Sequence, residues 1–266
     1  MRNILYLQSI IYFMISFVFP NIALANEPAT QLARQVVDQL MNVENEKAAS
    51  SIQQLEHQYP NYPLLGFMKV APLWAKAEST YDKNIRLTTL HNILGMLSKN
   101  IQRAQSKISK QPDNPNWKLS LGVSQAFRGL AYMRLGEWLN AYQAGREGRD
   151  TLRELVRNHP EVEDAYMVLG FYEYHTGNVP FYLKWLTWMI DLSGDAKLGL
   201  QYIHRAIKYA PVFSPEASRL LLLQTETNQA NACQRKERAQ EMATRYPNNE
   251  LFPWLEIKMK KICNQK

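Results

Sequence analysis

The stretch that decides the fold is residues 165–211, which read AYMVLGFYEYHTGNVPFYLKWLTWMIDLSGDAKLGLQYIHRAIKYAP. Its second half places Gly199, Ile203 and Ala206 at 12, 8 and 5 positions before Pro211. Steps of three and four residues return to one face of a helix, so these residues predict a small and apolar helix face. Because proline cannot continue a helix, we expect this helix to end just before Pro211.

The same arrangement recurs along the chain. Five prolines each follow a helix-like segment, at intervals of 52, 48, 51 and 36 residues: Pro60, Pro112, Pro160, Pro211 and Pro247. The small and apolar stripe is repeated before two of them, as Ala48, Ile52 and Leu55 and as Gly148, Leu152 and Leu155. It is weaker before Pro247, and before Pro112 it is displaced by one residue. Recurrent helix ends of this kind predict helix hairpins that stack on one another.

The stretch resembles the tetratricopeptide repeat, and more narrowly the exported bacterial repeat proteins of undefined activity. The resemblance is carried by Leu169-Gly170, Tyr172, Gly194-Asp195, Gly199-Leu200, Ile203, Ala206-Ile207 and Pro211, with a weaker match at Gly129, Tyr132, Gly136 and Ala141. Family repeats span ~34 residues, whereas three of the intervals here are near 50, so we expect longer helices or turns. The resemblance implies a right-handed α-solenoid of antiparallel helix pairs that binds a partner on its concave face.

The prolines and stripes divide residues 26–266 into one domain of helix pairs. The expected pairs are 29–43 with 45–58, 63–79 with 83–109, 116–135 with 137–158, 162–176 with 195–210, and 215–229 with 231–245. A last helix over 250–263 ends in lysines and should cap the open end of the stack. The predicted fold class is all-α, a tetratricopeptide-like solenoid with a capping C-terminal helix.

Composition agrees with an all-helical domain and excludes several function classes. Hydrophobic residues make up 46% of the 266-residue chain and charged residues 21%. With only 11 Gly and 13 Pro, the chain has few residues that favour turns, which indicates long helices. This balance excludes collagen-like, low-complexity and disordered chains. The formal net charge is +7, but the sequence has no long run of Lys and Arg, so we expect no nucleic-acid binding. The positive charge favours at most a weak contact with an anionic membrane surface.

Residues 1–25 are typical of a cleaved signal peptide. Arg2 precedes an apolar run over 4–19, and Ala23-Leu24-Ala25 is a small-x-small cleavage site. The alternative is an uncleaved anchor, although the run is short for a bilayer span. We expect cleavage before Asn26 and a periplasmic location, with secretion from the cell as the other outcome.

The two cysteines predict a disulfide between Cys233 and Cys263, because a pair in an oxidising compartment favours a bridge. If helices over 232–245 and 251–262 turn at 246–249, both cysteines lie about 20 Å from the turn and side by side. Two free buried thiols are the alternative.

Residues 179–192 are the most unusual local feature, since a helix over them would be apolar nearly all round. The simplest interpretation is core packing. The functional interpretations are a helix at the membrane interface or the aromatic lip of a ligand pocket. That pocket would be walled by Phe181, Tyr182, Trp185 and Trp188.

The sequence contains no recognisable catalytic or metal-binding motif. None of the five histidines lies four residues from another, no Cys-x-x-Cys occurs, and neither a G-x-S-x-G motif nor a Gly-rich phosphate loop is present. Asp195, which follows Gly194 at a predicted helix start, is better explained as a helix cap than as a catalytic acid. We therefore expect no catalytic residue, metal or cofactor, and a protein that is not an enzyme.

Recognition of a protein or peptide in the cell envelope is the leading hypothesis. The candidate partner-binding residues, taken from the first helices of the pairs, are Trp117, Gln125, Arg128, Tyr132, Tyr166, Tyr172 and Glu173. Core packing is the competing interpretation for each aromatic among them. A carrier or sensor of a small apolar or lipid-like ligand, bound near residues 179–192, is the alternative. A long open groove would favour the peptide, and a closed apolar cavity would favour the carrier. The sequence does not determine the oligomeric state.

Overall fold

The computed structural model describes residues 27–112, 114–179 and 194–264. The predicted signal peptide and the four aromatic residues of the insert, Phe181, Tyr182, Trp185 and Trp188, lie outside the described residues. Within them the chain is all-helical and has no strand, as the composition and prolines predicted. The helices are α3 (Pro28–Met41), α4 (Asn45–Gln58), α5 (Leu65–Ser79), α6 (Lys83–Ile108), α7 (Pro115–Leu135), α8 (Trp138–Asn158), α9 (Ala165–Gly177), α11 (Ala196–Tyr209), α12 (Ser214–Gln224), α13 (Gln229–Arg245) and α14 (Leu251–Cys263).

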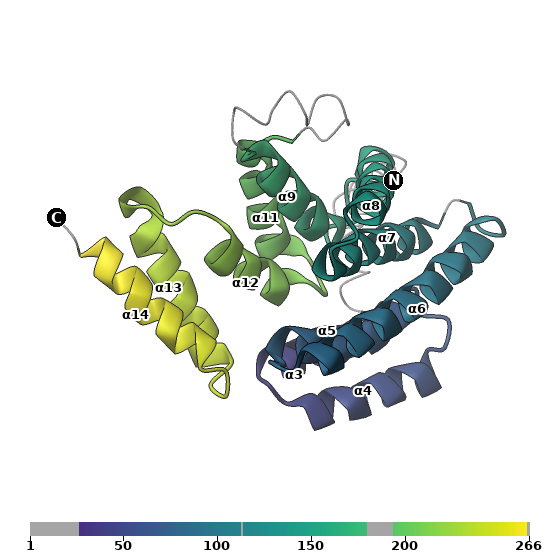
Figure 1. Cartoon of the computed structure of the whole chain (residues 1–266), viewed down its shortest axis with the longest axis horizontal. Helices are drawn as coiled ribbons and strands as arrows, with labels where there is room; N and C mark the ends of the chain where they lie inside the picture. The colour runs from purple at the N-terminus through teal and green to yellow at the C-terminus, as the bar shows by residue number, and fades with distance from the viewer. Residues whose placement is uncertain (1–26, 113, 180–193, 265–266) are drawn as a thin grey trace, which may run out of the picture.

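Neighbouring helices pack in the order of the chain (Figure 1). The hairpins α3–α4, α5–α6, α7–α8 and α9–α11 match the predicted pairs, and their ends lie within three residues of the predicted ones. The last predicted pair differs. Helix α12 ends at Gln224 rather than continuing to 229, and α13 packs chiefly along α14. The reason is local: the side chain of Asn228 accepts the backbone N–H of Asn231 in a capping box, which starts a new helix.

The small residues of the predicted stripe lie where two helices touch. A Cβ on Gly199 of α11 would lie 2.4 Å from the backbone nitrogen of Tyr174, and one on Gly170 of α9 would lie 2.8 Å from the nitrogen of Ile203. A Cβ on Gly148 of α8 would likewise lie 2.6 Å from the nitrogen of Ala126 on α7. The hairpins therefore close because glycine removes the atom that would separate their backbones.

The described residues form two hydrophobic clusters. The larger one extends from α3 to the first half of α12. The smaller one joins the end of α12 to α13 and α14 through Leu222, Met242, Tyr246, Phe252, Leu255 and Met259. Helix α14 thus ends the stack, as predicted, but its outer face is only partly polar because Trp254 and Ile257 are exposed.

Cys233 and Cys263 form the predicted disulfide, with their Cα atoms 4.9 Å apart. The bridge joins the start of α13 to the end of α14, at the end of this hairpin opposite its turn. Among the described helices, none combines the length and the hydrophobicity needed to cross a bilayer.

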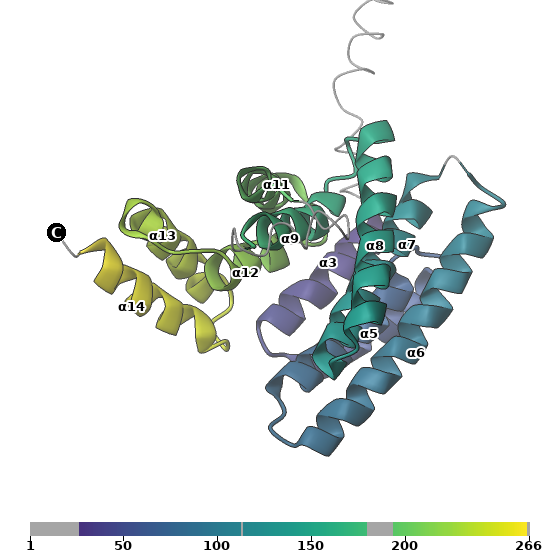
Figure 2. The ribbon, with the colours of Figure 1, turned by 45° about the horizontal axis from the view of Figure 1, so that its top comes forward.

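The two ends of the helix series meet, which hairpins that touch only their neighbours would not do. Helix α3 packs against α12, and residues near its C-terminal end bond to the turn between α13 and α14. Figure 2 shows α3 on the side of the molecule that faces α12. Helix α3 therefore contacts both α12 and the α13–α14 turn, at the other end of the helix series.

Candidate functional site

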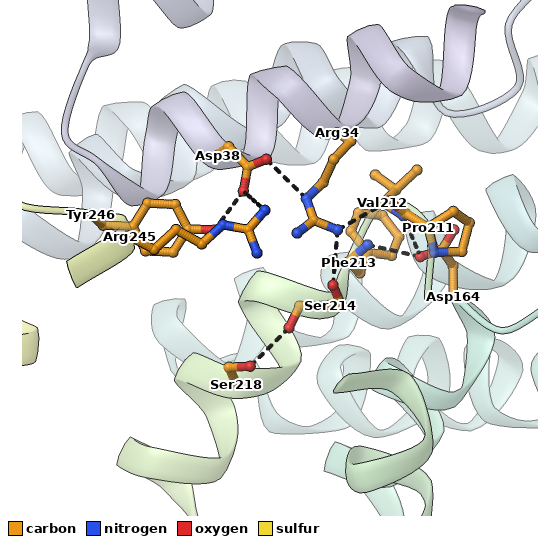
Figure 3. Close-up of polar contacts among 10 residues, drawn as sticks. All are labelled: Arg34, Asp38, Asp164, Pro211, Val212, Phe213, Ser214, Ser218, Arg245 and Tyr246. Atoms are coloured by element: carbon orange, nitrogen blue, oxygen red, sulfur yellow. Dashed lines mark hydrogen bonds and ion pairs between the residues drawn. The ribbon is translucent and has the colours of Figure 1, made fainter. Parts of the chain in front are cut away.

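Arg34 of α3 is the centre of the polar contacts that close the molecule (Figure 3). Its Nη1 donates to the hydroxyl of Ser214 at 2.8 Å and to the carbonyl of Pro211 at 3.2 Å. Its Nε donates to Asp38, one turn further along α3, at 3.0 Å. One guanidinium therefore ties the N-terminal helix to the start of α12.

Asp38 extends these contacts to the C-terminal hairpin. One of its carboxylate oxygens accepts from the hydroxyl of Tyr246 and lies 3.5 Å from the guanidinium of Arg245. The amide of Asn249 donates to the carbonyl of Met41 at 2.6 Å. Burial raises the pKa of Tyr246 well above its usual range, and the bond to Asp38 adds to this effect. The phenol is thus a donor at all physiological pH values.

Asp164 holds the other side of the same junction. Its buried carboxylate accepts the backbone N–H groups of Val212, at 3.1 Å, and Phe213, at 2.8 Å. These bonds attach the loop before α9 to the loop before α12. Burial raises the pKa of Asp164 to about 6, although both N–H bonds and the nearby Arg34 oppose the shift.

A half-enclosed cavity of about 350 Å³ lies on the inner side of the closed helix series. We call it the inner cavity; α3, α5, α7, α9, α12 and the α13–α14 turn all contribute to it. Its wall is aromatic: the ring of Phe67 lies 4.7 Å from that of Phe127 and 5.6 Å from that of Phe213, and Trp74 lies 5.5 Å from Phe127. The rest of the apolar lining consists of Val37, Leu40, Met41, Met68, Val70, Ala71, Ala75, Met167 and Leu251.

Charged and polar side chains surround this apolar wall. Glu78, Ser79, Glu216, Arg219 and Asn249 line the inner cavity together with the apolar residues. The carboxylate of Glu216 accepts two bonds from Arg219 and holds the pKa of that guanidinium above its usual range. An apolar hollow with a small number of fixed polar groups is the usual form of a binding site.

A second, more open groove of about 630 Å³ lies between α8 and the α9–α11 hairpin. It contains two of the predicted partner-binding residues, Tyr166 and Glu173, and we call it the arginine groove. It is lined by Arg153, Val156, Arg157, Tyr166, Glu173, Gly194, Asp195, Leu198, Tyr202 and Arg205.

Most charges of the arginine groove are paired within the chain. Arg153 donates twice to Glu173, at 3.1 and 2.6 Å, and the backbone N–H of Asp195 donates to the other oxygen of that carboxylate. Arg205 donates twice to Glu163, at 2.7 and 2.8 Å, and lies 4.0 Å from the ring of Tyr166. These pairs hold α8, α9 and α11 together, so the groove is built chiefly as a junction between helices.

Four of the other five predicted residues contact neighbouring helices, and none of the seven lines the inner cavity. Trp117 is buried beneath the cations of α6, and the amide of Gln125 accepts from Thr151 of α8 at 2.9 Å. Arg128 pairs with Glu147 of α8, the hydroxyl of Tyr172 accepts from Arg149 of α8, and Tyr132 is half-buried.

The residues that do line the inner cavity were missed by the sequence reasoning. Helix α7 presents Phe127 to it, the residue directly before the predicted Arg128. The pair Phe67 and Trp74 on α5 carried a usable signal, because a spacing of seven residues places two side chains on one helix face. Phe213 carried none, since it lies in a turn.

Comparison with protein families and with curated proteins identifies no relative of this chain. No protein-family model matches the chain. No curated protein shows significant sequence similarity to it. In the part of the chain that the structure describes, no group of His, Cys, Asp or Glu is placed to hold a metal ion.

Proposed function

We propose that this chain is a non-enzymatic binding protein of the cell envelope, which recognises a protein or peptide partner by taking an apolar side chain of that partner into the inner cavity. The observation that carries the proposal is the aromatic wall of Phe67, Trp74, Phe127 and Phe213 around a half-enclosed space of about 350 Å³. Burial of one large apolar side chain there would stabilise a complex by about 1.5–3 kcal/mol.

The polar residues of the inner cavity support a protein partner. Tight protein interfaces combine an apolar anchor in a pocket with surrounding polar residues that exclude water. Glu78, Glu216 and Arg219 supply such groups, and Asn249 adds an amide. An extended peptide could therefore bond through its backbone to these groups while one of its side chains enters the hollow.

The fold and location belong to the same proposal. We infer a right-handed, tetratricopeptide-like solenoid, supported by hairpins packed in chain order and by the contact between Gly170 and Gly199. Export to the periplasm is supported by the signal-like residues 1–25 and by the disulfide, because such bonds persist in oxidising compartments.

A small apolar or lipid-like ligand is the second candidate, at a different place from the one expected. The contacts of Arg34 and Asp38 close the inner side of the molecule, and the resulting volume falls within the range of small-molecule sites. We place this ligand in the inner cavity, because residues 180–192 of the expected pocket lie outside the described residues.

A variant that fills the inner cavity tests the site. Ala75 lines the cavity and is exposed, so Ala75→Trp places an indole in the opening without disturbing the core. Ala49, exposed on α4, provides the matched control Ala49→Trp. We expect anilinonaphthalene sulfonate to fluoresce with the original chain and with Ala49→Trp, and at least tenfold weaker binding to Ala75→Trp. Equal binding by all three chains would refute the site.

Mass spectrometry of the native protein, purified from envelope fractions, separates the two candidates. A bound small molecule that is present in the original chain and in Ala49→Trp, but lost from Ala75→Trp, would establish the second candidate. A co-purifying protein or peptide with the same dependence on Ala75 would establish the first.

A further inference from the structure

Exposed large apolar side chains gather at one end of the molecule. Tyr81 is fully exposed, Trp138 and Leu139 are each 69% exposed, and Ile85 and Met133 are 45% and 40% exposed. All five lie in or beside two turns, the one between α5 and α6 and the one between α7 and α8. We call this group of five residues the apolar tip.

The two turns lie together in space. The guanidinium of Arg134, at the end of α7, is 3.0 Å from the carboxylate of Glu78, at the end of α5. Figure 2 shows the α5–α6 turn and the start of α8 at the same, lower end of these helices. The apolar tip is therefore one surface feature, and apolar patches on soluble domains mark interaction sites.

Cations surround the apolar tip. Lys76, Lys83 and Arg86 are exposed and form no ion pair with any described residue. Lys83 occupies the first position of α6, where the positive end of the helix dipole disfavours a cation, so its placement does not serve helix stability. The nearby carboxylates are largely engaged: Glu78 pairs with Arg134, Asp82 caps α6, and Glu137 accepts from Asn140.

We propose that the apolar tip docks the protein on an anionic lipid bilayer. Trp and Tyr favour the interface between lipid and water, where an amphipathic ring meets both phases, and neighbouring Lys and Arg attract anionic headgroups. Two projecting turns suit insertion between headgroups better than they suit a flat protein surface. The chain's formal charge of +7, or +6 without Arg2 of the predicted signal peptide (30 − 24), adds a general attraction of the same sign. This inference does not depend on what the inner cavity binds.

Sedimentation with vesicles tests the proposal. All chains are purified with the same N-terminus and mixed with vesicles of phosphatidylethanolamine and phosphatidylglycerol in equal parts, or of phosphatidylcholine alone. We expect the original chain to prefer the anionic vesicles. Removing Trp138 and Leu139 together (Trp138→Ser, Leu139→Ser) should weaken that binding more than tenfold. Lys83→Gln and Arg86→Gln should each weaken it about fivefold, on anionic vesicles only.

The outer face of α14 provides the matched control, since Trp254 and Ile257 are also exposed and Lys258 and Lys261 lie beside them. Trp254→Ser with Ile257→Ser should leave vesicle binding within twofold of the original. Equal or greater loss in this control, no loss in the tip variant, or no binding by the original chain would overturn the proposal. Self-association that the tip variant abolishes, in place of vesicle binding, would assign the surface to a second copy instead. Unchanged circular dichroism of every variant confirms that the fold is retained.

Discussion

The guanidinium of Arg34 donates a hydrogen bond to the hydroxyl of Ser214, 2.8 Å away and 180 residues further along the chain. This contact joins the N-terminal helix to a helix near the C-terminal end. Both helices line the half-enclosed inner cavity, so the contact brings together two of its walls. The stability of the molecule should therefore depend on residues at this junction more than on its exposed ion pairs.

Replacing Arg34 by methionine tests that dependence. Arg34→Met keeps an apolar stem but removes the bonds to Asp38, Pro211 and Ser214, so we expect the free energy of unfolding to fall by roughly 2 kcal/mol. Urea denaturation measures the change. Arg238→Met removes only an exposed pair with Glu241 and should change the free energy by less than about 0.5 kcal/mol. Similar losses in both variants would show that the junction has no special role.

The glycine contact between α9 and α11 predicts a difference between two alanine variants. Gly199→Ala would force a Cβ to within 2.4 Å of the backbone nitrogen of Tyr174, and should cost about 3 kcal/mol. A Cβ on Gly95 of α6 would meet nothing within 4 Å, so Gly95→Ala should raise stability by up to about 1 kcal/mol. Thermal unfolding of the two variants gives the comparison. A Gly199→Ala chain as stable as the original would contradict the close packing of α9 and α11.

The disulfide should stabilise chiefly the last hairpin. Cys233 and Cys263 close a loop of 30 residues, for which the chain-entropy model gives about 3–4 kcal/mol. The double substitution Cys233→Ser and Cys263→Ser should lower the denaturation midpoint and speed hydrogen exchange in α13 and α14 first. Adding a reductant should change the original chain in the same way and leave the double variant unaffected. Uniform acceleration of exchange over all helices would contradict this local effect.

Asp164 predicts how stability depends on pH. Its pKa is raised from 3.8 to about 6 in the folded chain, so between these values the folded chain keeps a proton that the unfolded chain has lost. The stabilisation is complete below pH 4 and is lost as the pH rises through 6, by on the order of 3 kcal/mol. Asp164→Asn still offers an oxygen to Val212 and Phe213 but does not titrate. The free energy of unfolding of the original chain, relative to that of this variant, should thus fall from pH 4 to pH 7. If the free energies of both chains changed in parallel with pH, the raised pKa of Asp164 would be contradicted.

Much of the fold could be predicted because its signals are local. Proline positions marked the helix ends, and the three- and four-residue steps that lead to Gly148 and Gly199 marked faces where helices meet. The pairing of Cys233 with Cys263 could be predicted because the rise per residue of two helices joined by one turn places both cysteines at the same distance from that turn. The boundary after Gln224 was missed because the cap at Asn228 carries no proline or glycine.

The closure of the molecule and its cavity could not be predicted in this way. Arg34 and Ser214 share no periodic pattern, and a contact between them depends on the summed rotation of every hairpin in between. The residues that line the inner cavity were not predicted, for a related reason. The resemblance pointed to the first helix of each pair, but whether Phe127 or Arg128 faces inward depends on helix rotation, which packing decides. Of the predicted partner-binding residues, Tyr166 and Glu173 line the arginine groove together.

The central claim is that the inner cavity receives a side chain of a protein or peptide partner. The most direct measurement replaces Ala75 by a photo-crosslinking residue in living cells, with the same replacement of Ala49 as the control. Mass spectrometry then identifies what has been captured after irradiation. We predict one or a few defined protein adducts from position 75 and none from position 49. The absence of protein adducts at position 75, or the same adducts from both positions, would contradict the claim.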